Sequence, residues 1–223
     1  MTRLVFVRHG ESQVTVDRVI GGHRTCSGLS ALGRLQAERL RDRWAANPEF
    51  QAALVVASQY PRAQETARIV LPALGDLPLQ IDAGFGEHDP GPICDGMTYT
   101  EYVERFSPPQ GGFHDDDPFA SIFPDGETVA AFAFRVGAAV RRLTEADGEA
   151  SSTIVVFCHA GVVDTVLRQA LKAPATGAFE IRTLNTSITE VELVRANRWR
   201  LHRYNDAVHL AGLPAETVRV TDG

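Results

Sequence analysis

The sequence of 223 residues contains few cysteines and no pattern that would use them together. Its three cysteines, Cys26, Cys94 and Cys158, lie far apart and include no CxxC pair. This spacing fits neither a disulfide framework nor a zinc site. Cys158 ends the apolar run 154–158, so we expect it to be a small core residue. The cysteine usage favours a reducing environment, and we expect a cytoplasmic protein.

Long apolar runs and an excess of positive charge are also missing. Residues 1–3 precede only four apolar residues, too few for the hydrophobic part of a secretory signal, and no run is long enough to cross a membrane. The formal net charge of −6 gives no general attraction to nucleic acid or to an anionic membrane. We therefore expect neither nucleic acid nor a membrane as a partner.

Short apolar runs alternate with helical patterns along most of the chain. Strands are predicted at residues 4–7, 53–57, 79–81 and 153–157. Helices are predicted at residues 31–46, 60–74, 126–146 and 162–171, with Ser30 and Asp125 as N-caps. Such alternation is typical of βαβ units, which build a parallel sheet. Residues 187–194 and 199–204 alternate apolar and polar, which predicts an antiparallel hairpin at the sheet edge.

These patterns predict an α/β fold: a three-layer α/β/α sandwich with a mostly parallel central sheet and antiparallel edge strands. Residues 84–124 differ from the rest, because they are rich in proline and glycine and contain only one short predicted helix, at 98–106. A long irregular segment of this kind favours a functional cover, although a tolerated insertion is the alternative. We expect one domain, residues 1–223, with this inserted loop and helix cover. The exposed edge of the hairpin could pair with a second copy of the chain as a homodimer.

Charged and polar side chains follow directly after three of the predicted strands. Arg8, His9 and Gly10 follow the first strand, Ser58 and Arg62 follow the second, and His159 follows the fourth. In an open α/β sheet, ligands bind at the carboxyl ends of the strands. The planar donor fork of arginine matches phosphate oxygens. We therefore expect a pocket for a phosphoryl group at this edge.

The same segments resemble the histidine phosphatase superfamily, also called the phosphoglycerate mutase-like family, and in particular its phosphatase branch. The resemblance extends over roughly residues 3–210. The matching segments, in the family's order, are residues 8–12, 29–37, 58–67, 87–91, 124–128 and 159–161.

The resemblance implies a role for each matching residue. His9 would be the nucleophile that forms a phosphohistidine, and Glu87 would be the general acid and then the general base. The phosphate-binding residues would be Arg8, Arg62, His159, Thr15 and Gly161. Phosphoryl transfer depends mostly on positioning and charge stabilisation, so this site needs no metal or other cofactor.

Several assignments leave alternatives open. Thr15 stands where the family often has asparagine, and its hydroxyl can still donate one hydrogen bond. His23 and Arg24 are candidates to contact the rest of the substrate, or they are ordinary surface residues. His88 and Asp89 could supply the acid in place of Glu87. The acidic segment 114–117 could suggest a metal, but consecutive aspartates in a loop are usually only solvated.

Three functions fit these residues: a phosphatase, a bisphosphoglycerate-dependent mutase, and a binding module without catalysis. Apart from histidines, residues 84–124 contain one basic residue, Arg105, and their carboxylates would repel a second phosphate. This composition favours a phosphatase acting on a small phosphomonoester over a mutase. The presence of the whole set of catalytic residues argues against a binding module.

Overall fold

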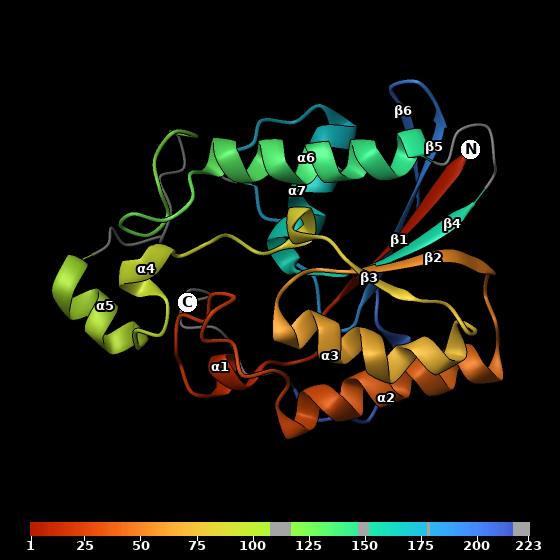
Figure 1. Ribbon diagram of the computed structural model, residues 1–223, viewed down its shortest axis with the longest axis horizontal. Coiled ribbons are helices and arrows are strands. Elements are labelled where there is room, and N and C mark those ends of the chain that lie inside the picture. The colour runs from red at the N-terminus through yellow and green to blue at the C-terminus, as the bar shows by residue number, and fades with distance from the viewer. Residues whose placement is uncertain (108–116, 147–151, 178, 216–223) are drawn as a thin grey trace.

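The computed structural model describes residues 1–107, 117–146, 152–177 and 179–215. Its centre is a six-stranded sheet in the order β3-β2-β4-β1-β5-β6 (Figure 1). The strands are β1 (Thr2–Arg8), β2 (Ala52–Ala57), β3 (Leu79–Ile81), β4 (Thr153–Cys158), β5 (Ile188–Arg195) and β6 (Arg198–Asp206). Strands β1 to β4 run parallel, whereas β5 is antiparallel to β1 and β6 to β5. The predicted mostly parallel sheet with an antiparallel hairpin at its edge is confirmed.

Helices cover both faces of this sheet. The α-helices are α1 (Gln13–Val16), α2 (Ala31–Ala46), α3 (Pro61–Val70), α4 (Gly91–Cys94), α5 (Tyr99–Phe106), α6 (Val129–Ala146) and α7 (Ala160–Leu171). Short 3₁₀ helices are η1 (Leu71–Ala73), η2 (Ala83–Phe85) and η3 (Val208–Leu210). In Figure 1, α2 and α3 lie on one face of the sheet, and α6 and α7 lie on the other. Within the described residues, no helix is both long and apolar enough to span a membrane.

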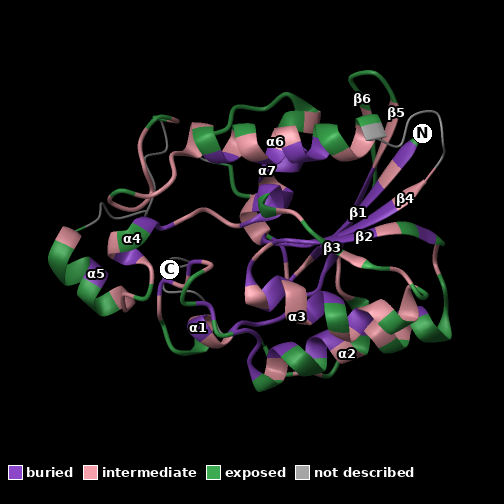
Figure 2. Cartoon of the chain, viewed as in Figure 1, coloured by how far each residue is buried: buried purple, intermediate pink, exposed green. Residues whose placement is uncertain are grey.

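The central strands are buried on both faces, as Figure 2 shows by their colour. Successive side chains of a strand point to opposite faces. In β1, Leu4 and Phe6 therefore join the apolar cluster under α6 and α7, while Val5 and Val7 join the cluster under α2 and α3. This double burial explains why the strands are continuous apolar runs in the sequence.

Three predicted helix boundaries differ from the structure. The helix predicted over 162–171 begins two residues earlier, at Ala160, directly after His159. The helix predicted from residue 126 begins at Val129, and Asp125 does not cap it, because Asp125 has a left-handed backbone conformation with φ of 56°. The Thr128 hydroxyl accepts a hydrogen bond from Ala131 N at 3.1 Å instead. The helix predicted over 60–74 ends at Val70 and continues as η1, which contains Pro72. Proline has no N–H and cannot continue the α-helical ladder.

Helices α4 and α5 belong to the predicted cover and lie with α1 at one end of the molecule (Figure 1). Thr98 and Glu101 form a capping box at the start of α5, as favoured by their spacing. Tyr102 packs its ring against Phe106 and Phe123, with centroid distances of 5.7 and 5.3 Å. His114, Asp115 and Asp116, which we considered as a metal site, lie outside the described residues.

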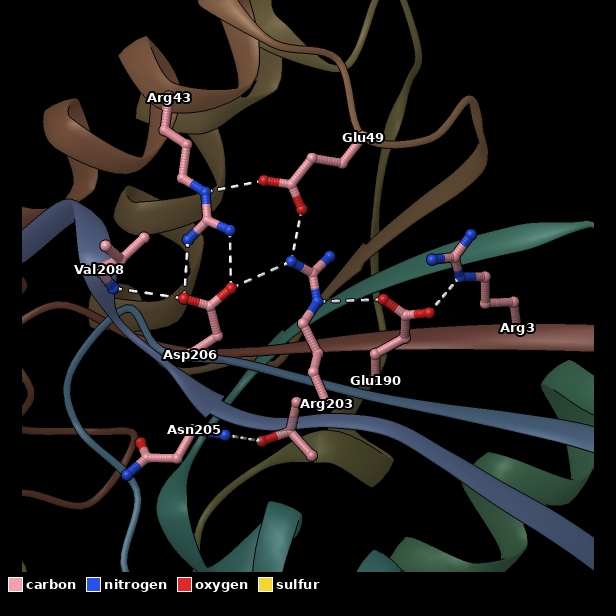
Figure 3. A network of polar contacts seen from close by, with 9 residues as sticks. Arg3, Arg43, Glu49, Glu190, Arg203, Asn205, Asp206 and Val208 are labelled. Atoms are coloured by element: carbon pink, nitrogen blue, oxygen red, sulfur yellow. Dashed lines mark hydrogen bonds and ion pairs between the residues drawn. The ribbon is translucent and has the colours of Figure 1, made fainter.

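The hairpin of β5 and β6 is attached to the end of α2 by ion pairs (Figure 3). Arg43, in the last turn of α2, donates to Glu49 at 2.7 Å and to Asp206 at 2.6 Å. Arg203 on β6 also contacts Glu49 and Asp206, and it donates to Glu190 of β5 at 3.1 Å. The network holds the hairpin beside β1, whose carboxyl end carries the candidate nucleophile.

Candidate active site

His9 lies one residue beyond β1 and is almost completely buried. Its Nδ1 lies 2.6 Å from the carbonyl oxygen of Gly10. A carbonyl can only accept, so Nδ1 carries the proton in this hydrogen bond and Nε2 keeps its lone pair. The hydrogen bond therefore holds the neutral imidazole in the tautomer that a nucleophile needs.

Arg62 lies in the first turn of α3 and is buried beside His9. Its Nε donates to His9 Nε2 at 3.2 Å, and a terminal nitrogen donates to the carbonyl of Gly21 at 3.1 Å. The Thr66 hydroxyl donates to Arg62 O at 2.7 Å and accepts from Gly10 N at 3.0 Å. The first turn of α3 is thus joined to the turn after β1, and a guanidinium is held at the reactive nitrogen of His9.

His159 comes directly after β4 and lies beside His9, with the two ring centroids 5.0 Å apart. Its Nε2 is hydrogen-bonded to the Ser58 hydroxyl at 2.7 Å. That hydroxyl also accepts from Tyr60 N at 3.2 Å. The predicted meeting of residues from the ends of β1, β2 and β4 is therefore what the structure shows.

Arg8 and the backbone of His9 are held by a segment that precedes β5. The Arg8 guanidinium donates to the carbonyl of Thr183, and Asn185 Nδ2 donates to His9 O at 2.8 Å. Thr186 N donates to Arg8 O at 2.9 Å. The sequence patterns did not point to this segment. Its one signal is a run of polar residues, 185–187, immediately before a buried strand.

Glu87 follows η2, and its carboxylate faces the start of α7. Its Oε2 accepts from Gly161 N at 3.2 Å, and its Oε1 accepts from His88 N at 3.2 Å. A Cβ on residue 161 would overlap Glu87 Oε1, so this approach requires glycine. Gly161 contacts the candidate acid in this arrangement, and its expected contact with phosphate remains a prediction.

The two alternative acids beside Glu87 have other contacts. The His88 ring stacks on Phe132 at a centroid distance of 3.6 Å, and burial lowers the pKa of this imidazole. Asp89 accepts from Gly91 N at 3.0 Å and lies 3.9 Å from Arg24. The geometry therefore favours Glu87 over both neighbours.

The remaining predicted contacts lie in the loop before α2 and in α1. Thr15 shares a hydrogen bond of 2.8 Å with Ser12. His23 packs the edge of its ring against Tyr60, with centroids 6.0 Å apart. Arg24 donates to Asp95 Oδ2 at 2.9 Å. The roles predicted for these three residues in phosphate or substrate binding remain predictions.

Asp95 anchors this loop to the end of α4. It also accepts from Gly22 N at 2.8 Å and from the Thr25 hydroxyl. Burial opposes ionisation of Asp95, but the hydrogen bonds from Thr25, Gly22 and Arg24 outweigh it and lower the pKa of the carboxyl. An ionised Asp95 therefore holds the loop that carries His23 and Arg24.

Tyr60 is a second residue that our sequence analysis did not single out. The Arg62 guanidinium lies over its ring at 4.5 Å, and the His159 ring packs against it at 4.7 Å. Its hydroxyl donates to the carbonyls of Glu87 and His88 at 3.2 and 3.3 Å. Burial raises the pKa of Tyr60, so the hydroxyl remains a donor. Its position just after β2, between Ser58 and Arg62, was the available signal.

The described residues include no group of three or more histidine, cysteine, aspartate or glutamate side chains placed to hold a metal ion. The side chains gathered around His9 provide a neutral imidazole, guanidinium donors, a second imidazole and a carboxylate. This set can attack an electrophile, stabilise anionic oxygens and transfer a proton.

The chain resembles known proteins in sequence and in fold. A model of the histidine phosphatase superfamily (branch 1) matches residues 4–207. An adenosylcobalamin/alpha-ribazole phosphatase of Escherichia coli (strain K12) is 32% identical over 185 residues, which cover 81% of this chain and 84% of that protein. Phosphoglycerate mutase-like protein 4 of Arabidopsis thaliana is 29% identical over 207 residues, 93% of this chain and 86% of that protein.

A solved structure shares the fold as well. The alpha-ribazole phosphatase from Shigella flexneri superposes with a TM-score of 0.75 at 26% identity, covering 92% of this chain and 96% of the other. The family model and the phosphatases among the relatives fit a phosphoric monoester hydrolase. With matching sequence motifs, sheet topology and a family match over residues 4–207, the chain belongs to the histidine phosphatase superfamily, branch 1.

Proposed function

We propose that this chain is a metal-independent phosphatase that hydrolyses a small phosphomonoester through a phosphohistidine on His9. One observation carries the proposal: the hydrogen bond of 2.6 Å between His9 Nδ1 and Gly10 O, which leaves Nε2 as the nucleophilic nitrogen. The guanidinium of Arg62, 3.2 Å from that nitrogen, lies where the oxygens of a transferring phosphoryl group need positive charge.

In the first step, His9 Nε2 attacks phosphorus and the bond from phosphorus to the ester oxygen breaks. Glu87, in its protonated form, gives its proton to the departing oxygen, so that an alcohol leaves. Arg8, Arg62 and His159 bind the phosphoryl oxygens. The hydrogen bond of 2.7 Å between His159 Nε2 and the Ser58 hydroxyl orients the His159 ring for this contact.

In the second step, Glu87 acts as a base. Its carboxylate takes a proton from water, the water oxygen attacks phosphorus, and the bond from phosphorus to His9 Nε2 breaks. Inorganic phosphate leaves, and Glu87 is protonated for the next cycle. Positioned acid or base catalysis contributes about 10²–10⁴-fold, so loss of Glu87 would slow the reaction without abolishing it.

The surroundings of the site favour a substrate with a single phosphate. Arg24, one of the cations near the cover, donates to Asp95 at 2.9 Å and lies 3.9 Å from Asp89. Its charge is thus already compensated by two carboxylates. A second phosphate at this position would be repelled by the same carboxylates. We infer that Asp89 and Asp95, in the described part of the cover, favour small monophosphates over bisphosphates.

Phosphate release from p-nitrophenyl phosphate in the presence of EDTA tests the proposal. We expect turnover by the natural chain and its loss in His9→Ala, with Asp42→Ala on the exposed surface of α2 as the matched control. A variant that kept full activity without the His9 imidazole would contradict the proposal. So would an absence of turnover across a broad set of phosphomonoesters, which would favour a binding module.

A comparison of substrates distinguishes a phosphatase from a mutase. We expect a monophosphate to be hydrolysed faster than the corresponding bisphosphate at physiological salt. Isomerisation of phosphoglycerate without release of free phosphate would identify a mutase instead.

A further inference from the structure

The segment 124–128 matches the family motifs, yet none of its residues has a place in the reaction described above. Within it, Glu127 forms a bidentate ion pair with Arg135 of α6. Arg135 Nε donates to Glu127 Oε1 at 2.9 Å, and its Nη2 donates to Oε2 at 2.7 Å. Both side chains are largely buried, with exposed fractions of 27% for Arg135 and 14% for Glu127. A buried pair of this kind is held in one geometry.

The remaining donors of Arg135 point at the backbone that precedes and includes Glu87. Nη1 donates to the carbonyls of Ala83, Gly84 and Gly86 at 3.0, 3.1 and 3.1 Å. Nη2 donates to the carbonyl of Glu87 at 3.3 Å. One guanidinium thus donates hydrogen bonds to four backbone carbonyls of a single turn.

Glu127 holds the other side of the same turn. Its Oε2 accepts from Asp89 N at 3.3 Å, and its own N–H donates to Asp89 O at 2.8 Å. The backbone of residues 86–89 is therefore fixed on both sides of Glu87 by one ion pair.

We propose that Arg135 and Glu127 are positioning residues that set the Glu87 carboxylate for proton transfer. The inference rests on the proposed function, because it assigns their effect to the acid and base steps of that reaction. Arginine suits this place because its planar fork can pair with a carboxylate and still donate to several carbonyls, which lysine cannot do. Neither side chain needs to touch the substrate.

The dependence on the leaving group separates positioning from a general structural role. An alkyl phosphate such as glycerol phosphate needs the proton from Glu87, whereas 2,4-dinitrophenyl phosphate has a leaving group that departs without it. For Arg135→Gln we expect kcat/KM on the alkyl ester to fall by about 10²-fold, the loss that a small misplacement of a catalytic group can cause. We expect only a slight change on the dinitrophenyl ester.

Arg142 offers a matched control on the same helix. It donates to Asp82 at 2.9 Å, just before η2, but makes none of the carbonyl contacts around Glu87. We expect Arg142→Gln to leave both substrates unaffected. Glu127→Gln, which keeps the size of the side chain, should repeat the selective loss, and it replaces Arg135→Gln if that variant does not fold.

A double mutant tests whether the effect passes through Glu87. Once Glu87 is replaced by Gln, the further change Arg135→Gln should cost little on the alkyl ester, since the two act as a unit. Equal losses on both esters, or additive losses in the double mutant, would overturn the inference. Those results are distinct from a failure of the proposed function, in which His9→Ala would retain activity.

Discussion

At the scale of single residues, the proposed chemistry depends on two hydrogen bonds. One fixes the tautomer of the nucleophile, and the other orients the carboxylate of the acid. Gly10 O accepts from His9 Nδ1 and keeps Nε2 available for attack. Gly161 N donates to Glu87 and holds the carboxylate at the start of α7. Each hydrogen bond uses the backbone of a glycine, so each side chain is oriented by chain geometry.

Gly161→Ala should disturb the acid and leave the nucleophile in place. The added methyl group would overlap Glu87 Oε1, so the carboxylate must turn away from the N–H of residue 161. We expect kcat/KM for alkyl phosphates to fall by about 10–100-fold, within the range that acid catalysis provides, with a smaller loss of kcat/KM for p-nitrophenyl phosphate. Kinetics of Gly161→Ala and of the natural chain on both esters check this expectation, and the denaturation midpoints of the two proteins show whether the variant is destabilised. An equal loss on both, without destabilisation, would contradict the role given to this contact.

The site residues that directly follow strands could be predicted from the sequence, whereas those that act through the backbone could not. His9, Arg62 and His159 could be found because a buried apolar run stops at a polar residue each time. Asn185 and Arg135 could not be found, because both donate to backbone carbonyls of segments far away in the sequence. Such contacts depend on how distant segments of the chain fold together. Because every residue type has the same backbone carbonyl, the residue type of the acceptor gives no signal in the sequence.

At the scale of elements, the turn after β1 is fastened to α2. Glu11 N donates to Gln36 Oε1 at 2.8 Å, and the Ser30 hydroxyl donates to Glu11 Oε1 at 2.9 Å. The backbone of Gly33 lies against that of Gly10 and Glu11, where a Cβ on Gly33 would overlap Glu11 O. Helix α2 therefore fixes the turn that carries His9.

Gly33→Ala tests this contact between elements. The overlap is with backbone, which cannot move aside cheaply, so we expect a loss of about 1–3 kcal/mol in the free energy of unfolding and lower activity. Gly137→Ala on α6 is the control, because the atoms nearest to its added methyl belong to the flexible amide of Gln169. There the better helix propensity of alanine, about 0.5–1 kcal/mol, should offset the contact. Chemical denaturation of both variants measures the change in the free energy of unfolding. Equal destabilisation of the two would contradict the role given to the contact between α2 and the turn after β1.

Element types were predictable, but some of their ends and their order in the sheet were not. Helix α2 follows the prediction over residues 31–46, because Ser30 caps it and accepts from Gly33 N at 3.0 Å. The start of α6 was misplaced because Asp125, a good cap by residue type, adopts a left-handed conformation. The strand order β3-β2-β4-β1-β5-β6 depends on which strands pair with each other. Local residue patterns do not specify this long-range pairing.

At the scale of the whole molecule, the edge hairpin and the 3₁₀ helix η3 connect protonation to stability. The pKa of Asp206 lies well below its usual range, and the largest cause is the hydrogen bond from Arg43. Burial lowers the pKa of His209 to about 4, and this imidazole is hydrogen-bonded to Thr186 at 2.9 Å. Thr186 N in turn donates to Arg8 O at the end of β1.

Acid should therefore destabilise the fold in two stages. Between pH 6.5 and about 4, His209 takes up a proton in the unfolded chain but not in the folded one, so the free energy of unfolding decreases as pH falls. We expect a loss on the order of 1–3 kcal/mol over this window. Below it, protonation of Asp206 breaks its pairing with Arg43 and destabilises the fold further.

His209→Gln should reduce the slope of the first stage and leave the second unchanged. A part of the first slope remains, because burial lowers the pKa of His88 as well. Urea denaturation at a series of pH values compares this variant with the natural chain. We expect the two curves to separate between pH 6.5 and 4 and to run parallel below pH 4, where Asp206 titrates in both. A variant with an unchanged slope in the upper window would contradict the part given to His209.

The most direct test of the account is the trapping of the intermediate on His9. A good leaving group makes phosphorylation independent of the Glu87 proton, but hydrolysis still needs Glu87 as a base. Rapid quenching of Glu87→Gln mixed with radiolabelled p-nitrophenyl phosphate should therefore show near-stoichiometric label on the protein. We expect this label to be acid-labile, stable to alkali, located on His9 and absent from the His9→Ala variant. Turnover without any covalent label, or label on another residue, would contradict it.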